Sequence, residues 1–274
     1  MRTGSSLKYL RSLLIGVCSL AVNDCVAADT VETEAGPYIG IFGGVGSSPS
    51  TSLRQQGAVY LNPPNSFPML PIDANGSTDG SNGIPVAGAH IGYEWDHWEI
   101  APGWGLKPAL ELEGIYIGEH SPVGTMPVHP SFLGTQYVTV PITTGVVLPN
   151  AVLVLQTPYS DKIFPYFGLG AGGAFVSISG SDSANPSEPG INHFNSAPDA
   201  SDFAFAWQLK AGIKAEIFKN TYLFLEYRYL SIDPTSYTFG STDYPGVHLP
   251  TTSWNVNLGR QEYNLFITGL QYKF

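Results

Sequence analysis

The stretch FAWQLKAGIKAEIFKNTYLFLEYRYL, residues 205–230, alternates apolar and polar side chains with a period of two. Between 205 and 217 the odd positions are apolar, whereas the even positions are small or polar. The alternation resumes after Lys219-Asn220, and an α-helix would instead repeat every 3.6 residues. Asn tolerates the positive φ of a tight turn, so the stretch predicts two antiparallel strands joined as a hairpin.

Six further segments carry the same signal to differing degrees. The alternation is clear at the end of the chain, weaker in three segments upstream, and less certain in two, one of them glycine-rich and the other containing Pro149. Because proline cannot donate a ladder hydrogen bond, Pro149 suggests a β-bulge or a late strand start. The predicted strands lie at about 37–46, 91–95, 110–116, 146–156, 167–175 and 266–274.

Short and long connections alternate along the chain. The short links fall at 96–106, 157–163 and 219–220. The long ones are rich in Gly, Pro, Ser, Asn and Thr and fall at about 47–84, 119–144, 178–202 and 233–260. This order predicts an all-β fold, an eight-stranded antiparallel up-and-down β-barrel with its long loops all at one end.

Composition favours a membrane barrel over a soluble β-sandwich, which also has short alternating strands. Charged residues make up only 12% of the 274 residues, about half the level usual in soluble proteins, and aromatic residues make up another 12%. No apolar run approaches the length of a transmembrane helix, and only helices and closed barrels pair every backbone group in hydrocarbon. We therefore predict a transmembrane barrel with short periplasmic turns and four long external loops.

The N-terminus predicts export. Arg2, Lys8 and Arg11 precede a short apolar run, and the small residues of 26–28 suit cleavage before Asp29. The predicted organisation is a cleaved signal peptide, residues 1–28, and an outer-membrane β-barrel domain, residues 29–274. Because both cysteines lie inside the signal peptide, the mature chain would have no thiol chemistry.

Four segments resemble the opacity-type small porin family, eight-stranded outer-membrane β-barrels of Gram-negative bacteria. They are GPYIGIFGG at 36–44, PYFGLGAGG at 165–173, the hairpin at 205–229 and the terminal GLQYKF. The resemblance implies an integral outer-membrane protein. It also implies that the final strand, with Leu270, Tyr272 and Phe274, is the signal read by the barrel-assembly machinery. Members of that family take part in host adhesion, serum resistance, envelope integrity and small-solute passage.

The predicted inward faces carry charges of both signs. An eight-stranded barrel has room only for its own side chains, so acids and bases must meet inside it. Since unpaired ions there would be costly, we expect a salt-bridged plug; the alternative is a narrow ion or proton path. This lumen charge network comprises Glu94, Glu111, Glu113, Lys210, Lys214, Glu216, Glu226, Arg228 and Lys273.

The sequence gives only weak evidence for a metal site or an enzyme active site. His120, His129, His193 and His248 fall in the predicted loops and could gather with Glu119, Asp199 and Asp243 around a metal, but their spacing matches no metal motif. We therefore expect no metal site and no cofactor. No Gly-x-Ser-x-Gly elbow occurs, so we expect no enzyme; a lipid A-modifying enzyme is the least favoured alternative.

The functional prediction is a non-enzymatic, surface-exposed barrel that serves envelope structure and host interaction, in the manner of an adhesin. The alternative is a narrow porin for small solutes or ions. Expected partners are outer-membrane lipid and lipopolysaccharide, the barrel-assembly machinery and host surface molecules. The formal net charge of −10 argues against nucleic acid.

Overall fold

The computed structural model describes residues 35–63 and 67–274. The predicted signal peptide and its cleavage site lie outside the described residues and stay predictions. No helix in the described part of the chain is long and apolar enough to cross a membrane.

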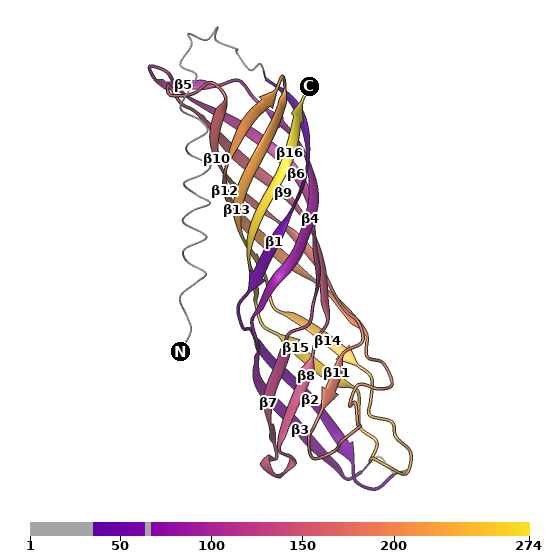
Figure 1. The fold of residues 1–274 in the computed structure, drawn as a ribbon. Coiled ribbons are helices and arrows are strands. Elements are labelled where there is room, and N and C mark those ends of the chain that lie inside the picture. The colour runs from indigo at the N-terminus through magenta and orange to yellow at the C-terminus, as the bar shows by residue number, and fades with distance from the viewer. Residues whose placement is uncertain (1–34, 64–66) are drawn as a thin grey trace. The chain divides into compact units, whose positions relative to one another are not determined.

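Eight antiparallel strands close into a barrel (Figure 1). Around the barrel each strand pairs with its neighbour in sequence, and pairing of the first strand with the last completes the ring. The predicted eight-stranded up-and-down barrel is therefore confirmed. Its strands are β1 (Gly36–Ser48), β4 (Ser81–Glu94), β6 (Trp104–His120), β9 (Ile142–Gln156), β10 (Ile163–Ile178), β12 (Ala200–Phe218), β13 (Thr221–Ile232) and β16 (Gln261–Lys273).

The barrel is apolar outside and carries its charges inside. On β13, Leu223, Leu225 and Tyr227 are 41–44% exposed, whereas the intervening Glu226 and Arg228 are buried. The other barrel strands follow the same alternation and together expose a belt of large apolar side chains. An outer wall of this kind matches the hydrocarbon of a bilayer. A soluble β-sandwich would instead place charged residues on its outer surface.

The short connections differ in one place from the prediction. Asn220 adopts a φ of 60° in the two-residue turn between β12 and β13, as the hairpin requires. The link after β4 is not irregular throughout, because it contains a four-residue strand, β5 (Trp98–Ala101), paired with the start of β6. Since β5 pairs with β6 alone, it lies outside the ring.

The prediction at Pro149 was wrong about where the strand starts. Strand β9 begins at Ile142, seven residues before the proline, and its register with β6 is unbroken where Leu112 faces Pro149. On the β10 side pairing lapses between the Gly170–Asn150 and Gly173–Val147 pairs without any change of register. The missing proline N–H thus interrupts the ladder on one side and produces no bulge.

The four long connections contain strands of their own, which the sequence did not predict. They pair across connections into a second, seven-stranded sheet of order β11-β8-β7-β3-β2-β15-β14, here called the extension. Its composition, rich in Gly, Pro and Ser, hides the alternation that marks the barrel strands. The strands are β2 (Ser52–Tyr60), β3 (Met69–Thr78), β7 (Val123–His129), β8 (Thr135–Thr139), β11 (Asp182–Ala184), β14 (Thr235–Phe239) and β15 (Trp254–Leu258), with a 3₁₀ turn, η1 (Ser131–Leu133).

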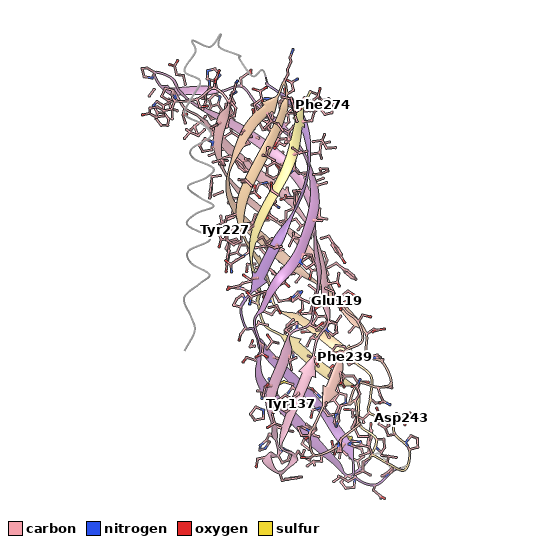
Figure 2. The ribbon with its side chains drawn as sticks, viewed as in Figure 1. Glu119, Tyr137, Tyr227, Phe239, Asp243 and Phe274 are labelled. Carbon is pink, nitrogen blue, oxygen red and sulfur yellow. The ribbon has the colours of Figure 1, made fainter. Side chains whose placement is uncertain are left out.

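The extension has its own packed interior. Phe194 and Phe239 stack at a ring distance of 4.4 Å, and both are buried, as is Trp254. Tyr137, by contrast, is 41% exposed on the same sheet (Figure 2). On the surface, hydrogen bonds from Arg54 to Asp73 hold the pKa of that carboxyl below its usual range.

We expect Phe239→Ala to destabilise the extension. Removing a buried phenylalanine costs about 3–5 kcal/mol, and here it also unstacks Phe194. Limited proteolysis of the folded protein, with fragments identified by mass spectrometry, should show faster cleavage within the four long connections. Phe132→Ala is the matched control, since Phe132 is 76% exposed on the same extension; equal cleavage of the two variants would contradict the prediction.

Candidate functional site

The interior of the barrel holds most of the predicted charge network. Inward positions of β4, β6, β12, β13 and β16 supply its acids and bases, and each of these side chains is buried. Strand alternation puts them on one face, and the small circumference of the barrel brings opposite strands within reach. The residues that it brings together are Glu94, Glu111, Glu113, Lys210, Lys214, Glu226, Arg228 and Lys273.

A first cluster surrounds Arg228, whose side chain is fully buried. Its guanidinium pairs with Glu113 at 2.5 Å and with Glu226, its neighbour two residues earlier on β13. Lys210 from β12 pairs with Glu111 and lies 3.8 Å from Glu113 and 3.9 Å from Glu226. Two bases and three acids thus form one network across the lumen. The Arg228 guanidinium also lies over the ring of Phe42, 4.3 Å from its centroid.

A second cluster is centred on Glu94. Its two carboxylate oxygens accept from Lys214 at 2.5 Å and from Lys273 at 2.8 Å. Lys214 also lies over the ring of Tyr222, 5.3 Å from its centroid. These contacts join β4 to β12 and β16, strands that are not all neighbours around the barrel.

Neutral side chains, which the sequence analysis did not single out, complete the first cluster. The Asn150 amide donates to Glu113 at 3.1 Å and Gln208 donates to the same oxygen at 2.6 Å. Tyr38 donates to Glu111 at 3.2 Å and Tyr166 to Glu226 at 2.9 Å. The alternation predicts that these side chains point inward. Amides and phenols are uncharged, however, so a prediction of ion pairs did not include them.

Glu216 corrects the predicted network. It lies at an inward position of β12, but near the end of the strand, and it is only half buried. Its carboxylate accepts from the Asn220 backbone N–H at 3.1 Å. The tight turn after β12 therefore uses this acid as a local hydrogen-bond acceptor, and it makes no ion pair with the lumen bases of the described residues.

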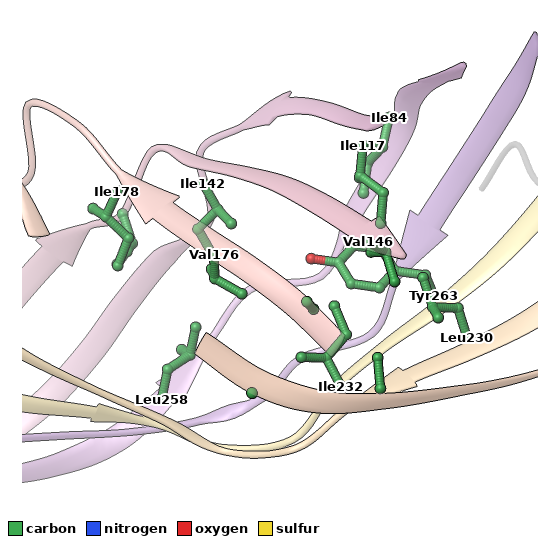
Figure 3. Packing of buried hydrophobic residues seen from close by; sticks show 14 of the residues in the cluster. Ile84, Ile117, Ile142, Val146, Val176, Ile178, Leu230, Ile232, Leu258 and Tyr263 are labelled. Atoms are coloured by element: carbon green, nitrogen blue, oxygen red, sulfur yellow. The ribbon is translucent and has the colours of Figure 1, made fainter. Parts of the chain in front are cut away.

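An apolar layer fills the loop-side half of the lumen, which the sequence analysis did not anticipate. Inward side chains from several strands pack there, including Ile117, Val146, Leu230 and Tyr263, all at most 1% exposed (Figure 3). The same cluster continues into buried residues of the extension such as Leu258. A usable signal existed, since the inward positions at this end of the strands, such as Val176 and Ile178, are apolar.

A very small cavity lies beside the ion clusters. It has a volume of about 20 Å³ and is lined by Tyr38, His90, Glu111 and Lys210 among others. That is room for about one water molecule. His90 packs among Tyr38, Phe42 and Phe224, with ring centroids 5.6–6.1 Å apart.

His90, Glu111 and Glu113 have donor atoms within 4.8 Å of one another. However, both carboxylates already pair with bases, Glu111 with Lys210 and Glu113 with Arg228, and these bases occupy the place that a cation would take. This arrangement of buried ion pairs ties opposite strands of the barrel together.

The loop histidines do not form the single set considered from the sequence. His120 contacts the Tyr263 hydroxyl at 3.4 Å, and His129 is exposed on β7. His193 and His248 do meet, with ring centroids 5.4 Å apart, beside Glu188, which the sequence analysis missed. Two predicted acids lie elsewhere: Asp199 accepts from Ser179 and Gly180, and the Asp243 backbone bonds Asn195.

The residues of the predicted assembly signal lie at outward positions of the last strand or just after it. Leu270, Tyr272 and Phe274 are 45%, 44% and 70% exposed. Their recognition by the barrel-assembly machinery stays a prediction.

We expect Arg228→Ala to lower the thermal stability sharply, because Glu113 and Glu226 would lose their buried partner. Breaking a buried pair costs about 3–5 kcal/mol, which corresponds to a fall in Tm of roughly 10 °C. The measurement is thermal unfolding of the refolded protein in detergent, followed by circular dichroism. The control is Arg260→Ala, since Arg260 pairs with Asp233 at 3.4 Å on the surface; that change should cost no more than about 1 kcal/mol. Equal melting points for the two variants would exclude a stabilising role for the network.

The chain is similar to solved outer-membrane proteins and matches one family model. No curated protein matches the chain. Among solved structures, OprG from Pseudomonas aeruginosa is 15% identical with a TM-score of 0.42, covering 90% of this chain and 99% of its own. Neisserial surface protein A is 12% identical with a TM-score of 0.36, covering 87% and 97%. The outer-membrane protease OmpT from Escherichia coli is 8% identical with a TM-score of 0.42, covering 90% and 99%. The family model described as the outer membrane protein beta-barrel domain matches residues 12–261, and the chain is therefore a member of that family, an integral protein of the outer membrane.

Proposed function

We propose that the protein is a closed, non-enzymatic outer-membrane barrel that acts through its extension, as a surface interaction module in contact with host molecules or envelope components. The observation that carries the proposal is the filled lumen. Buried ion pairs around Arg228 and Glu94 occupy one part, and the apolar layer around Leu230 and Tyr263 occupies another. A barrel so filled has no path for solute, so its exposed extension is the part available to act.

The surface of the extension supports a role in recognition. Large apolar side chains stand exposed on its connecting segments, with Phe67 at 71%, Phe132 at 76% and Val247 at 77%. The segments that carry Phe67 and Val247 lie next to each other. A hydrogen bond from the Tyr60 N–H to the Pro250 carbonyl at 3.0 Å joins them. Exposed apolar residues on a structured surface are typical of interaction sites. The sparse charge favours a partner that is bound by apolar contacts and hydrogen bonds over one attracted by long-range electrostatics.

The conductance of the refolded mature protein in a planar lipid bilayer tests the closed lumen. We expect protein that has demonstrably inserted to give no reproducible current steps at moderate voltages. A well-characterised open porin refolded in the same detergent serves as the positive control. Steady single-channel steps would instead favour the alternative function, a narrow porin for small solutes or ions.

Adherence of otherwise non-adherent bacteria that display the protein tests the extension. We expect cells with the wild-type protein to bind epithelial monolayers, and the double variant Phe132→Ser and Val247→Ser to bind several-fold less because two exposed apolar contacts are lost. Tyr159→Ser is the matched control, since Tyr159 is 84% exposed in the short connection after β9, at the opposite end of the barrel. Binding no greater than that of cells with an empty vector would count against the interaction role.

A further inference from the structure

We propose that Glu188, His193 and His248 form a binding site for a divalent transition-metal ion of the Zn²⁺ type on the extension. The site is independent of whether the lumen conducts. Glu188 and His193 come from the connection between β10 and β12, and His248 comes from the connection between β14 and β15. One carboxylate oxygen and one ring nitrogen from each histidine lie within 4.8 Å of one another.

The donor spacing suits a small metal ion. The His193 Nε2 lies 3.0 Å from Glu188 Oε2, and the His248 Nε2 lies 3.4 Å from Glu188 Oε1. Ligands bound tetrahedrally at roughly 2.0 Å lie about 3.3 Å apart. The three side chains therefore need little movement to take a shared ion, and two imidazoles with one carboxylate are a donor set that zinc accepts.

Each ring faces the Glu188 carboxylate through Nε2 and a backbone carbonyl through Nδ1. The His193 Nδ1 lies 2.7 Å from the Ser183 carbonyl and 3.0 Å from the side-chain amide nitrogen of Gln136, and the His248 Nδ1 lies 2.5 Å from the Leu249 carbonyl. A carboxylate oxygen can only accept, so without a cation a hydrogen bond to it needs a proton on Nε2. A metal ion would replace those protons and bind both nitrogens and the carboxylate together. A backbone carbonyl on the distal nitrogen is the usual support of a metal-bound histidine.

The backbone around the three residues is held in place by hydrogen bonds. The Glu188 N–H donates to Asn185 O at 2.9 Å, the His193 N–H to Ser183 O at 2.9 Å, and the His248 N–H to Tyr244 O at 3.0 Å. The His193 carbonyl also accepts from the Thr242 hydroxyl at 3.0 Å. The donors are thus positioned before any ion binds, which lowers the entropic cost of binding.

The site is sheltered but reachable from solvent. The side chains of His193, His248 and Glu188 are 7%, 12% and 36% exposed. A cavity of about 40 Å³ adjoins them and carries the polar side chains of Gln136 and Asn185 on its wall. Three protein ligands leave a fourth position open, and a water bound there would face this cavity.

Isothermal titration of Zn²⁺ into refolded protein without a histidine tag tests the proposal. We expect one ion per chain for the wild-type protein. His248→Ala and Glu188→Gln should each weaken binding at least about tenfold, because even outer-shell changes at metal sites have effects of that size. His129→Ala is the matched control, a histidine of the same extension outside the site, and should bind as the wild type does.

A second readout separates loss of the site from loss of the fold. Because the ion would join two connections, Zn²⁺ should raise the Tm of the wild-type protein and of His129→Ala, and should not raise that of Glu188→Gln. Glu188→Gln keeps the size of the side chain and can be checked for an intact extension by limited proteolysis. The absence of saturable binding to the wild type, or equal binding by His248→Ala, Glu188→Gln and His129→Ala, would overturn the proposal.

Discussion

The whole structure depends on one constraint, the need to pair every backbone N–H and C=O in a medium without water. Eight strands meet it by closing on themselves, and the β4–β6 pairing leaves the ring with no free edge. Closure then inverts the usual distribution of side chains. The outer wall has to be apolar, so the polar residues of strands such as β12 and β13 can go only inward. In a ring this narrow the inward side chains contact one another, so each of them must fit or pair with its neighbours.

The interior meets this demand in two ways that differ in their physics. Around Arg228 and Glu94, ions are desolvated and survive only because each finds partners of opposite sign, with amides and phenols accepting or donating the remaining bonds. Such a network is costly to break but adds little net stability, since desolvation offsets much of the attraction. Nearer the loops, aliphatic side chains fill the space without that penalty, and the packing runs on into the extension. The interior of the barrel is therefore filled in two ways, by ion pairs in one part and by aliphatic packing in another.

The sequence predicted what depends on local alternation and missed what depends on register and long-range contact. The inward direction of Glu113 and Arg228 followed from a period of two, because the pleat fixes it. Their mutual contact could be expected only in outline, since which residues face each other across a barrel depends on strand stagger. Glu216 shows the limit of predicting contacts from alternation. It lies at an inward position, but near the end of β12, where its carboxylate accepts from the turn. The strands of the extension were hidden by residues such as Pro71 and Gly76 within β3, and Glu188 lies among prolines and serines that give no periodic signal.

The order of the second sheet has a consequence for how this protein can change over evolutionary time. Each of the four connections contributes at least one strand, and β3 pairs with β7, β8 with β11, and β15 with β2, so each partner belongs to a different connection. Free surface loops can drift in sequence and length one by one at little cost. Here a change in one connection alters the hydrogen-bond ladder of its neighbour, so the four must diversify together. Independent variation is confined to the segments that join one strand to the next.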